Sequence, residues 1–209
     1  DSLLVGHTTT GTLDAATGNT GVGIDTLDAI TTGDDNVAIG YRAATAMTTG
    51  QYNVIIGKDA GYTASTGMSS AVAVGYQALR TNNGVNNVAV GRDALYYTTG
   101  AYNVAVGQSA GTGSTSASSN RNTFIGQSAG TAITTGGYNT TIGNTAGDNI
   151  TTGSGNIMIG DTSAAAADSA RTLKITSFDG TTTTNHIISD GSGNMTLAAD
   201  LTIGDDFNM

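Results

Sequence analysis

One short phrase, Asn-Val-Ala-Ile-Gly or a close variant of it, recurs along most of the chain and restricts the folds available to it. The glycine that ends each copy stands at positions 6, 23, 40, 57, 75, 91, 107, 126, 143 and 160. Successive glycines are 17, 17, 17, 18, 16, 16, 19, 17 and 17 residues apart. A repeat this short cannot bury an apolar face alone and must stack on its neighbours. The period therefore predicts a solenoid of about ten turns over residues 1–167.

The alternation inside the phrase indicates a strand. The residue before the glycine is Val or Ile in all ten copies, and the residue two places earlier is mostly β-branched as well. Alternate residues of a strand share one face, and β-branched residues favour strands. We expect these two rows to point into the coil. The fold class expected is all-β, a parallel β-solenoid (β-roll) in which the strands of successive turns pair.

The residue between those two rows is also mostly apolar, and it points to the opposite face. A strand that is apolar on both faces is usually covered on both. We therefore predict that the middle row is a subunit interface; a half-exposed row of small residues is the alternative. The predicted interface residues are Ala38, Ile55, Ala73, Ala89, Ala105, Phe124 and Met158. On this hypothesis Ala89→Asp would weaken the oligomer by burying an unpaired charge.

An asparagine opens eight of the ten phrases. Stacked asparagine side chains can form a ladder of amide hydrogen bonds, so we expect a structural role for this row. A ligand-binding row is the alternative. The residues of the predicted ladder are Asn19, Asn36, Asn53, Asn87, Asn103, Asn122, Asn139 and Asn156.

In seven repeats the second half begins with an alanine three places after the glycine, and it ends at a corner, often Thr-Thr-Gly. Because glycine supplies positive φ without steric cost, each turn is expected to contain two short strands and two corners. One repeat is longer, and its segment Thr112–Ser119 is expected to form a flexible surface loop. Asp25, Arg42 and Asp59 alternate in charge at one exposed position of successive turns, which favours this register.

A second module is expected at residues 168–209, after the period ends. Thr172–Phe178 is typical of a strand, Asp179-Gly180 indicates a hairpin, and Thr181–Ser189 is the expected partner strand. A further strand-like segment, Met195–Ile203, follows a glycine-rich corner. We interpret this region as a β-hairpin stem, truncated in a chain that is a piece of a longer one.

Composition excludes several classes of protein. The 209 residues include no Cys and no Pro, so neither a disulfide framework nor a collagen helix is available. The net charge of −9 disfavours nucleic acid and anionic membrane surfaces as partners. No apolar run reaches the roughly 20 residues of a membrane span.

The sequence contains two copies of the nucleophile motif G-x-S-x-G, around Ser109 and Ser128. The repeat explains both, because the same position holds Asp59 in another turn. The histidines, His7 and His186, stand in no triad pattern. We therefore predict no enzyme activity, no catalytic residue, no cofactor and no metal ligand.

The acidic residues and the threonines each leave an alternative open. Asp34-Asp35 and Asp205-Asp206 lack the spaced oxygen ligands of a calcium loop and are expected to be solvated corners. Paired carboxylates among the 16 acidic residues would suit a glycan depolymerase spike. Thr-Thr-Gly corners stacked into threonine rows would suit an ice-binding or other ordered-surface-binding solenoid.

The phrase Asn36–Gly40, the segment Tyr76–Leu79 and the Thr-Thr-Gly corners resemble repeats of phage tail fibres and of surface proteins that carry a self-cleaving chaperone domain of the endosialidase type. They are also similar to the head repeats of trimeric autotransporter adhesins, which have a shorter period. The resemblance covers residues 1 to about 167. It implies a homotrimeric fibre, extracellular, on a virion tail or a cell surface.

The function expected from these observations is a structural and adhesive fibre segment. Its partners would be two further copies of the chain and a host surface glycan or protein, with no nucleic acid and no membrane insertion. The residue after each glycine points outward on this hypothesis. The expected contacts with the host are Tyr41, Lys58, Tyr76 and Arg92.

Overall fold

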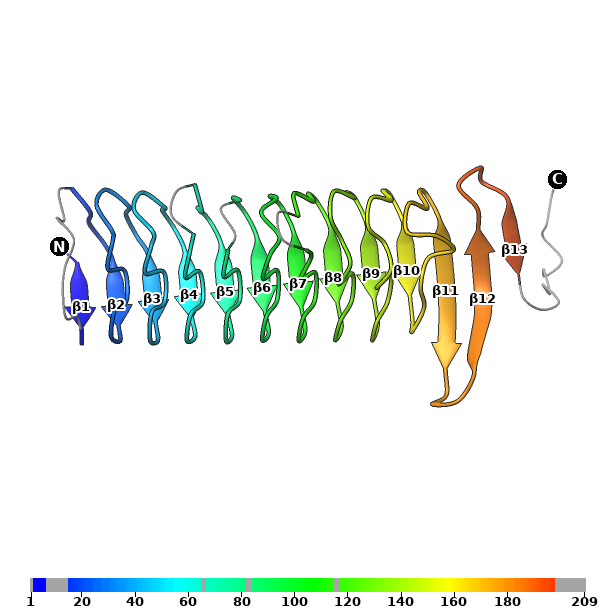
Figure 1. Cartoon of the computed structure of the whole chain (residues 1–209), viewed down its shortest axis with the longest axis horizontal. Coiled ribbons are helices and arrows are strands. Elements are labelled where there is room, and N and C mark those ends of the chain that lie inside the picture. Colours follow the sequence, from blue (N-terminus) through cyan, green and yellow to red (C-terminus); the bar gives the residue numbers. More distant parts are fainter. Residues whose placement is uncertain (1, 7–14, 65–66, 82–83, 115–116, 198–209) are drawn as a thin grey trace, which may run out of the picture.

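The computed structural model describes residues 2–6, 15–64, 67–81, 84–114 and 117–197. All regular secondary structure in these ranges is strand, and thirteen strands form a single sheet whose order follows the chain. Figure 1 shows the strands side by side, with the chain looping back between successive strands of the repeat region after β2. The chain is a β-solenoid, as its period predicted.

Ten strands of three residues each end one position before a repeat glycine. They are β1 (Leu3–Val5), β2 (Thr20–Val22), β3 (Val37–Ile39), β4 (Val54–Ile56), β5 (Val72–Val74), β6 (Val88–Val90), β7 (Val104–Val106), β8 (Thr123–Ile125), β9 (Thr140–Ile142) and β10 (Ile157–Ile159). Neighbours pair in parallel without a register shift, so that Ala38 lies opposite Ile55. Repeats of 16 to 19 residues are therefore all accommodated outside the strands.

The second half of the turn is not a strand, which corrects the prediction of two strands per turn. Residues two and four places after the glycine adopt left-handed backbone conformations, as at Arg42 (φ +57°) and Ala44 (φ +52°). This return segment still bonds to both neighbouring turns: Arg42 N donates to Ile24 O at 2.9 Å and Ala44 N donates to Ala60 O at 2.9 Å. Each turn thus has one straight side and one curled side.

The strands face the opposite way from the prediction. The middle row is buried, with Ala89 at 0 % exposure, while Val90 beside it is 37 % exposed. The return segments cover the middle row with alanine and leucine side chains such as Ala94 and Leu95, which are also fully buried. The predicted interface residues therefore lie in the core of a single chain, out of reach of a second one. They are Ala38, Ile55, Ala73, Ala89, Ala105, Phe124 and Met158.

The repeat glycines are required by close approach between turns. Gly91 has φ +135°, and a Cβ atom built there would lie 2.5 Å from the carbonyl oxygen of Gly107 in the next turn. A side chain would both strain this backbone and push the turns apart.

The insertion in the long repeat rejoins the stack. Ala117 is buried and forms a parallel bridge with Thr98, although a surface loop was expected over Thr112–Ser119. Residues 115 and 116 lie outside the described ranges.

The C-terminal hairpin extends the same sheet. β11 (Leu173–Phe178) pairs in parallel with β10, and β12 (Thr183–Ser189) and β13 (Met195–Leu197) continue antiparallel. The predicted hairpin is confirmed; the part of the expected last strand after Leu197 lies outside the described residues.

Candidate functional site

The outer face of the sheet is exposed and mostly apolar. It is formed by the first and third residues of β1 to β10, and we call it the sheet face. Its residues are Leu3, Val5, Thr20, Val22, Val37, Ile39, Val54, Ile56, Val72, Val74, Val88, Val90, Val104, Val106, Thr123, Ile125, Thr140, Ile142, Ile157 and Ile159. Ten of these side chains are exposed by 37–61 %. None of the twenty carries a charge, although water-facing strands normally carry polar residues.

The sheet face is regular along its length. Parallel strands lie about 4.8 Å apart, so ten of them extend over about 43 Å. The rows continue into the stem, because Leu173 pairs with Ile157 and Ile175 pairs with Ile159. The face is therefore a long, narrow apolar strip that repeats once per turn.

The asparagine row forms the ladder expected from the sequence. Asn36 Nδ2 donates to Asn19 Oδ1 at 2.9 Å and to Gly50 O at 2.8 Å, which joins three turns. The same side-chain bond links Asn53 to Asn36, and links each of Asn103, Asn122, Asn139 and Asn156 to the preceding asparagine. Ala71 interrupts the ladder. These amides are buried and use their donors within the coil, so their role is structural.

A cluster of charged and aromatic side chains lies on the return segments near β3 to β5. Asp59 is 2 % exposed, with Arg42 Nε 2.8 Å from its Oδ1 and Lys58 Nζ 2.7 Å from its Oδ2. Burial acts to raise the pKa of Asp59, but the contacts with Lys58 and Arg42 outweigh it and lower the pKa below its usual value. Two members of the predicted charge row thus meet, although Asp59 is buried and not exposed.

Aromatic rings and cations alternate across neighbouring turns on this side. Lys58 Nζ lies 5.8 Å from the ring centre of Tyr41 and 5.1 Å from that of Tyr76. Both tyrosines are exposed, as is Arg92 further along. The outward residues predicted to contact a host, Tyr41, Lys58, Tyr76 and Arg92, therefore do lie at the surface.

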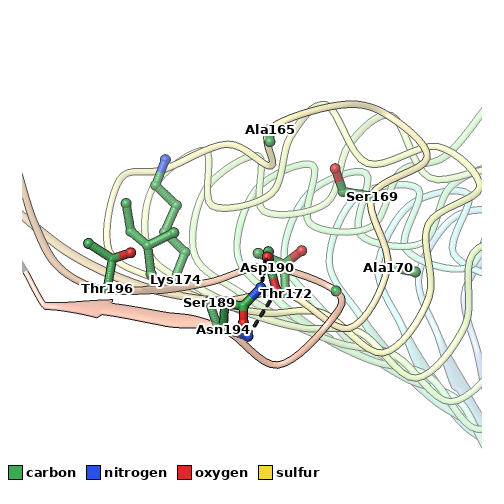
Figure 2. Close-up of a pocket in the computed structure, with 11 residues that line it drawn as sticks. Ala165, Ser169, Ala170, Thr172, Lys174, Ser189, Asp190, Asn194 and Thr196 are labelled. Carbon is green, nitrogen blue, oxygen red and sulfur yellow. Dashed lines mark hydrogen bonds between the residues drawn. The ribbon is translucent and has the colours of Figure 1, made fainter.

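A hollow of about 480 Å³ opens where the last turn meets the stem. Figure 2 shows Ala165, Ser169 and Ala170 on one side of it, with Lys174, Asp190 and Asn194 on the other. Lys174 pairs with Met158 and so ends the core row; its Nζ donates to Ser163 O at 3.2 Å. Asp190 Oδ2 accepts from Asn194 Nδ2 at 2.7 Å within its own corner. The hollow is the open end of the coil, where another turn would otherwise stack.

The structure gives no support to a serine nucleophile. Ser109 and Ser128 occupy the same left-handed position of two turns, each with φ +57°. His186 Nε2 lies 2.8 Å from Ser177 Oγ on the hairpin, and His7 lies outside the described residues. Asp34 accepts from the Thr17 backbone and hydroxyl, while Asp205-Asp206 falls outside the described residues.

The described residues contain no group of three or more His, Cys, Asp or Glu side chains placed to hold a metal ion. No helix in the same ranges is long and apolar enough to cross a membrane.

No family model matches the chain, and comparisons with curated proteins and with solved structures found no match.

Proposed function

We propose that this chain is a structural and adhesive fibre segment that assembles as a homotrimer through the sheet face. The observation that carries the proposal is that face: its twenty residues are uncharged and mostly β-branched, and ten of them are 37–61 % exposed in the described part of the chain. Exposed apolar strips of this length mark interaction sites in soluble proteins. The surface proposed here replaces the middle row, which is buried.

A second and third copy of the chain are the partners that match this face. A partner must present an apolar strip of equal length with the same spacing of about 4.8 Å per strand. Another copy does so in every turn, irrespective of the varying repeat length. Three copies turned about one axis bring three sheet faces together and leave the return segments outside. The number three follows the resemblance to trimeric adhesin heads and tail fibres.

The outward side would then serve attachment. Tyr41, Lys58, Tyr76 and Arg92 lie on the return segments, away from the trimer axis, where they can meet a host glycan or protein. The setting we propose is extracellular, on a virion tail fibre or a cell surface. The net charge of −9 fits this better than a nucleic acid partner.

Native mass by light scattering, at several protein concentrations, tests the assembly. We expect three times 20.7 kDa, about 62 kDa. A stable monomer of 20.7 kDa across the concentration range would contradict the proposal.

A matched pair of variants tests the surface. Val106→Asp places a charge on the sheet face and is expected to dissociate the trimer, because the carboxylate would be buried without a partner. Gln108→Asp adds the same charge two residues away, at an exposed position of the return segment, and is expected to leave the mass of the assembly unchanged. Equal masses for wild type and Val106→Asp, with circular dichroism intact, would place the interface elsewhere.

The composition of the sheet face does not support the ice-binding alternative. Only Thr20, Thr123 and Thr140 among its twenty positions are threonine. Thermal hysteresis at high protein concentration would revive that alternative.

A further inference from the structure

A second hollow, of about 290 Å³, lies on the side of the coil away from the sheet. It spans three successive return segments, those that follow β5, β6 and β7. The residues that line it are Gln77, Asp93, Tyr96, Tyr97, Ser109 and Thr112. Its volume is just below the roughly 300–1,000 Å³ typical of ligand sites, which suits a ligand of one or two sugar units.

The hollow exists because a stack of side chains stops there. Arg80 lies over the Tyr62 ring at 5.2 Å and over the Tyr96 ring at 5.3 Å, each measured to the ring centre. The next residue of this row is Thr112, whose side chain is too small to continue the stack. Tyr97 meets Tyr96 edge-on, with ring centres 4.3 Å apart, and adds a second aromatic wall.

Polar groups complete the lining at the spacing of the coil. Gln77, Asp93 and Ser109 occupy the same position of three consecutive turns, and backbone bonds such as Ser109 N to Arg92 O hold these segments together. Arg92 Nε donates to Asp93 Oδ2 at 2.8 Å, which orients the carboxylate. The hollow thus combines an amide, a carboxylate and hydroxyls with two phenol rings.

The two turns that precede the hollow do not offer this arrangement. At the positions equivalent to Gln77 and Asp93, Arg42 and Asp59 contact each other at 2.8 Å, and Asp59 is buried. Arg42 also lies 4.7 Å from the Tyr62 ring centre, so that the space is filled. The hollow is therefore a local feature and not a general consequence of the repeat.

We propose that this hollow binds a neutral saccharide. Tyrosine rings offer flat apolar surfaces with a negative face, on which the C–H groups of a sugar ring can lie. Carboxylate, amide and hydroxyl groups bind the equatorial hydroxyls from the side. Asp93 opposes an acidic sugar, because its carboxylate would face a like charge. The inference refines the adhesive part of the proposed function by naming the ligand class and its site.

Saturation-transfer NMR and titration with soluble sugars test this inference. The probes are the methyl glycosides of glucose, galactose, mannose and N-acetylglucosamine, with N-acetylneuraminic acid as the acidic comparison. We expect at least one neutral glycoside to bind, and bind more tightly than the acidic sugar. Tyr97→Ala and Gln77→Ala should each weaken binding, the tyrosine change by about tenfold or more.

Tyr138→Ala is the matched control. Tyr138 is exposed and stacks with Arg121, as Tyr96 does with Arg80, but it does not line the hollow. Its loss should leave sugar binding unchanged. No binding by any of the four neutral glycosides would overturn the inference, and so would wild-type affinity in both Tyr97→Ala and Gln77→Ala. Tighter binding of the acidic sugar would overturn the proposed ligand class.

Light scattering on the same samples separates the two proposals. A trimer that binds no sugar contradicts only the saccharide site. A monomer that binds sugar, and loses binding in Tyr97→Ala, contradicts only the trimeric fibre.

Discussion

At the scale of single residues, the buried asparagines add side-chain hydrogen bonds between turns to those of the backbone. Asn103 Nδ2 donates to Asn87 Oδ1 at 3.2 Å and to Ser119 O at 3.0 Å, while Asn103 Oδ1 accepts from the Asn122 backbone at 3.0 Å. One side chain thereby satisfies groups on the turns before and after its own. Buried polar groups left without such partners each cost about 1–3 kcal/mol.

Asn103→Asp should therefore destabilise the coil strongly. The new carboxylate loses both donors and places negative oxygen against Asn87 Oδ1 and Ser119 O, so we expect a loss of about 3 kcal/mol or more in the free energy of unfolding. Asn144→Asp, at an exposed position, should change it by less than about 0.5 kcal/mol. Urea unfolding compares the two; similar losses would mean that the ladder contributes little.

Asp59 makes stability depend on pH in acid. Its pKa is lowered in the folded chain, because the contacts with Lys58 and Arg42 outweigh the opposing effect of burial. A lowered folded pKa means that the stabilisation is complete above the unfolded value of about 3.9 and is lost as pH falls through the folded value. We expect Asp59→Asn to melt below wild type at pH 7, with the gap closing below about pH 4. A gap that persists or widens in acid would contradict this.

At the scale of the element, several turns pair a strand residue with a residue of complementary size six places later. Where the strand presents Ala73 or Ala89, the return segment supplies Leu79 or Leu95. Where the strand presents Phe124, the return segment has Gly130, and a Cβ atom there would overlap the Phe124 ring. Different pairs of residues thus fill the thin core in different turns.

Combining two opposite changes of size in this turn should restore part of the stability that each change alone removes. Gly130→Leu overfills the turn and should cost about 1–3 kcal/mol, and Phe124→Ala should cost about 3–5 kcal/mol by leaving a cavity. The double variant recreates the Ala89 and Leu95 pair, and Leu95 already adopts φ +50° at the equivalent position. We expect it to lose less than the sum of the single changes, by about 1–3 kcal/mol in urea unfolding. Additive losses would show that the two sites do not pack together.

The same elements show what the sequence can and cannot reveal. The period and the glycine positions locate all ten short strands, because close stacking tolerates no side chain at Gly91 and its equivalents. The inward face is ambiguous, because Val88, Ala89 and Val90 are all apolar. The return segment reads as a strand because its left-handed positions hold Arg42 and Leu79, which give no glycine signal.

At the scale of the whole molecule, the surfaces arise from rows of residues 16 to 19 positions apart. The hollow proposed to bind a saccharide is an example: Thr112 leaves room there because it follows Tyr96 in its row, and Tyr96 follows Arg80. Such rows can be read from the sequence once repeats are aligned by their glycines. Their exposure cannot be read in this way, because it depends on which side of the strand is covered by the return segment.

Removing one whole turn should keep the fold and the assembly while abolishing the hollow. Deletion of residues 88–103 joins Asn87 directly to Val104, which restores the Asn-Val-Ala-Val-Gly phrase and keeps every later turn in register. Because a solenoid repeat contacts only its neighbours, we expect a folded trimer shortened by about 4.8 Å. The deletion removes Asp93, Tyr96 and Tyr97, so neutral glycosides should no longer bind.

Deletion of residues 88–95, half a turn, is the control; it breaks the register and should unfold the neighbouring turns. Circular dichroism, light scattering and sugar titration on the two deletions test this prediction. An unfolded or aggregated product from the whole-turn deletion would contradict the stacking of interchangeable turns.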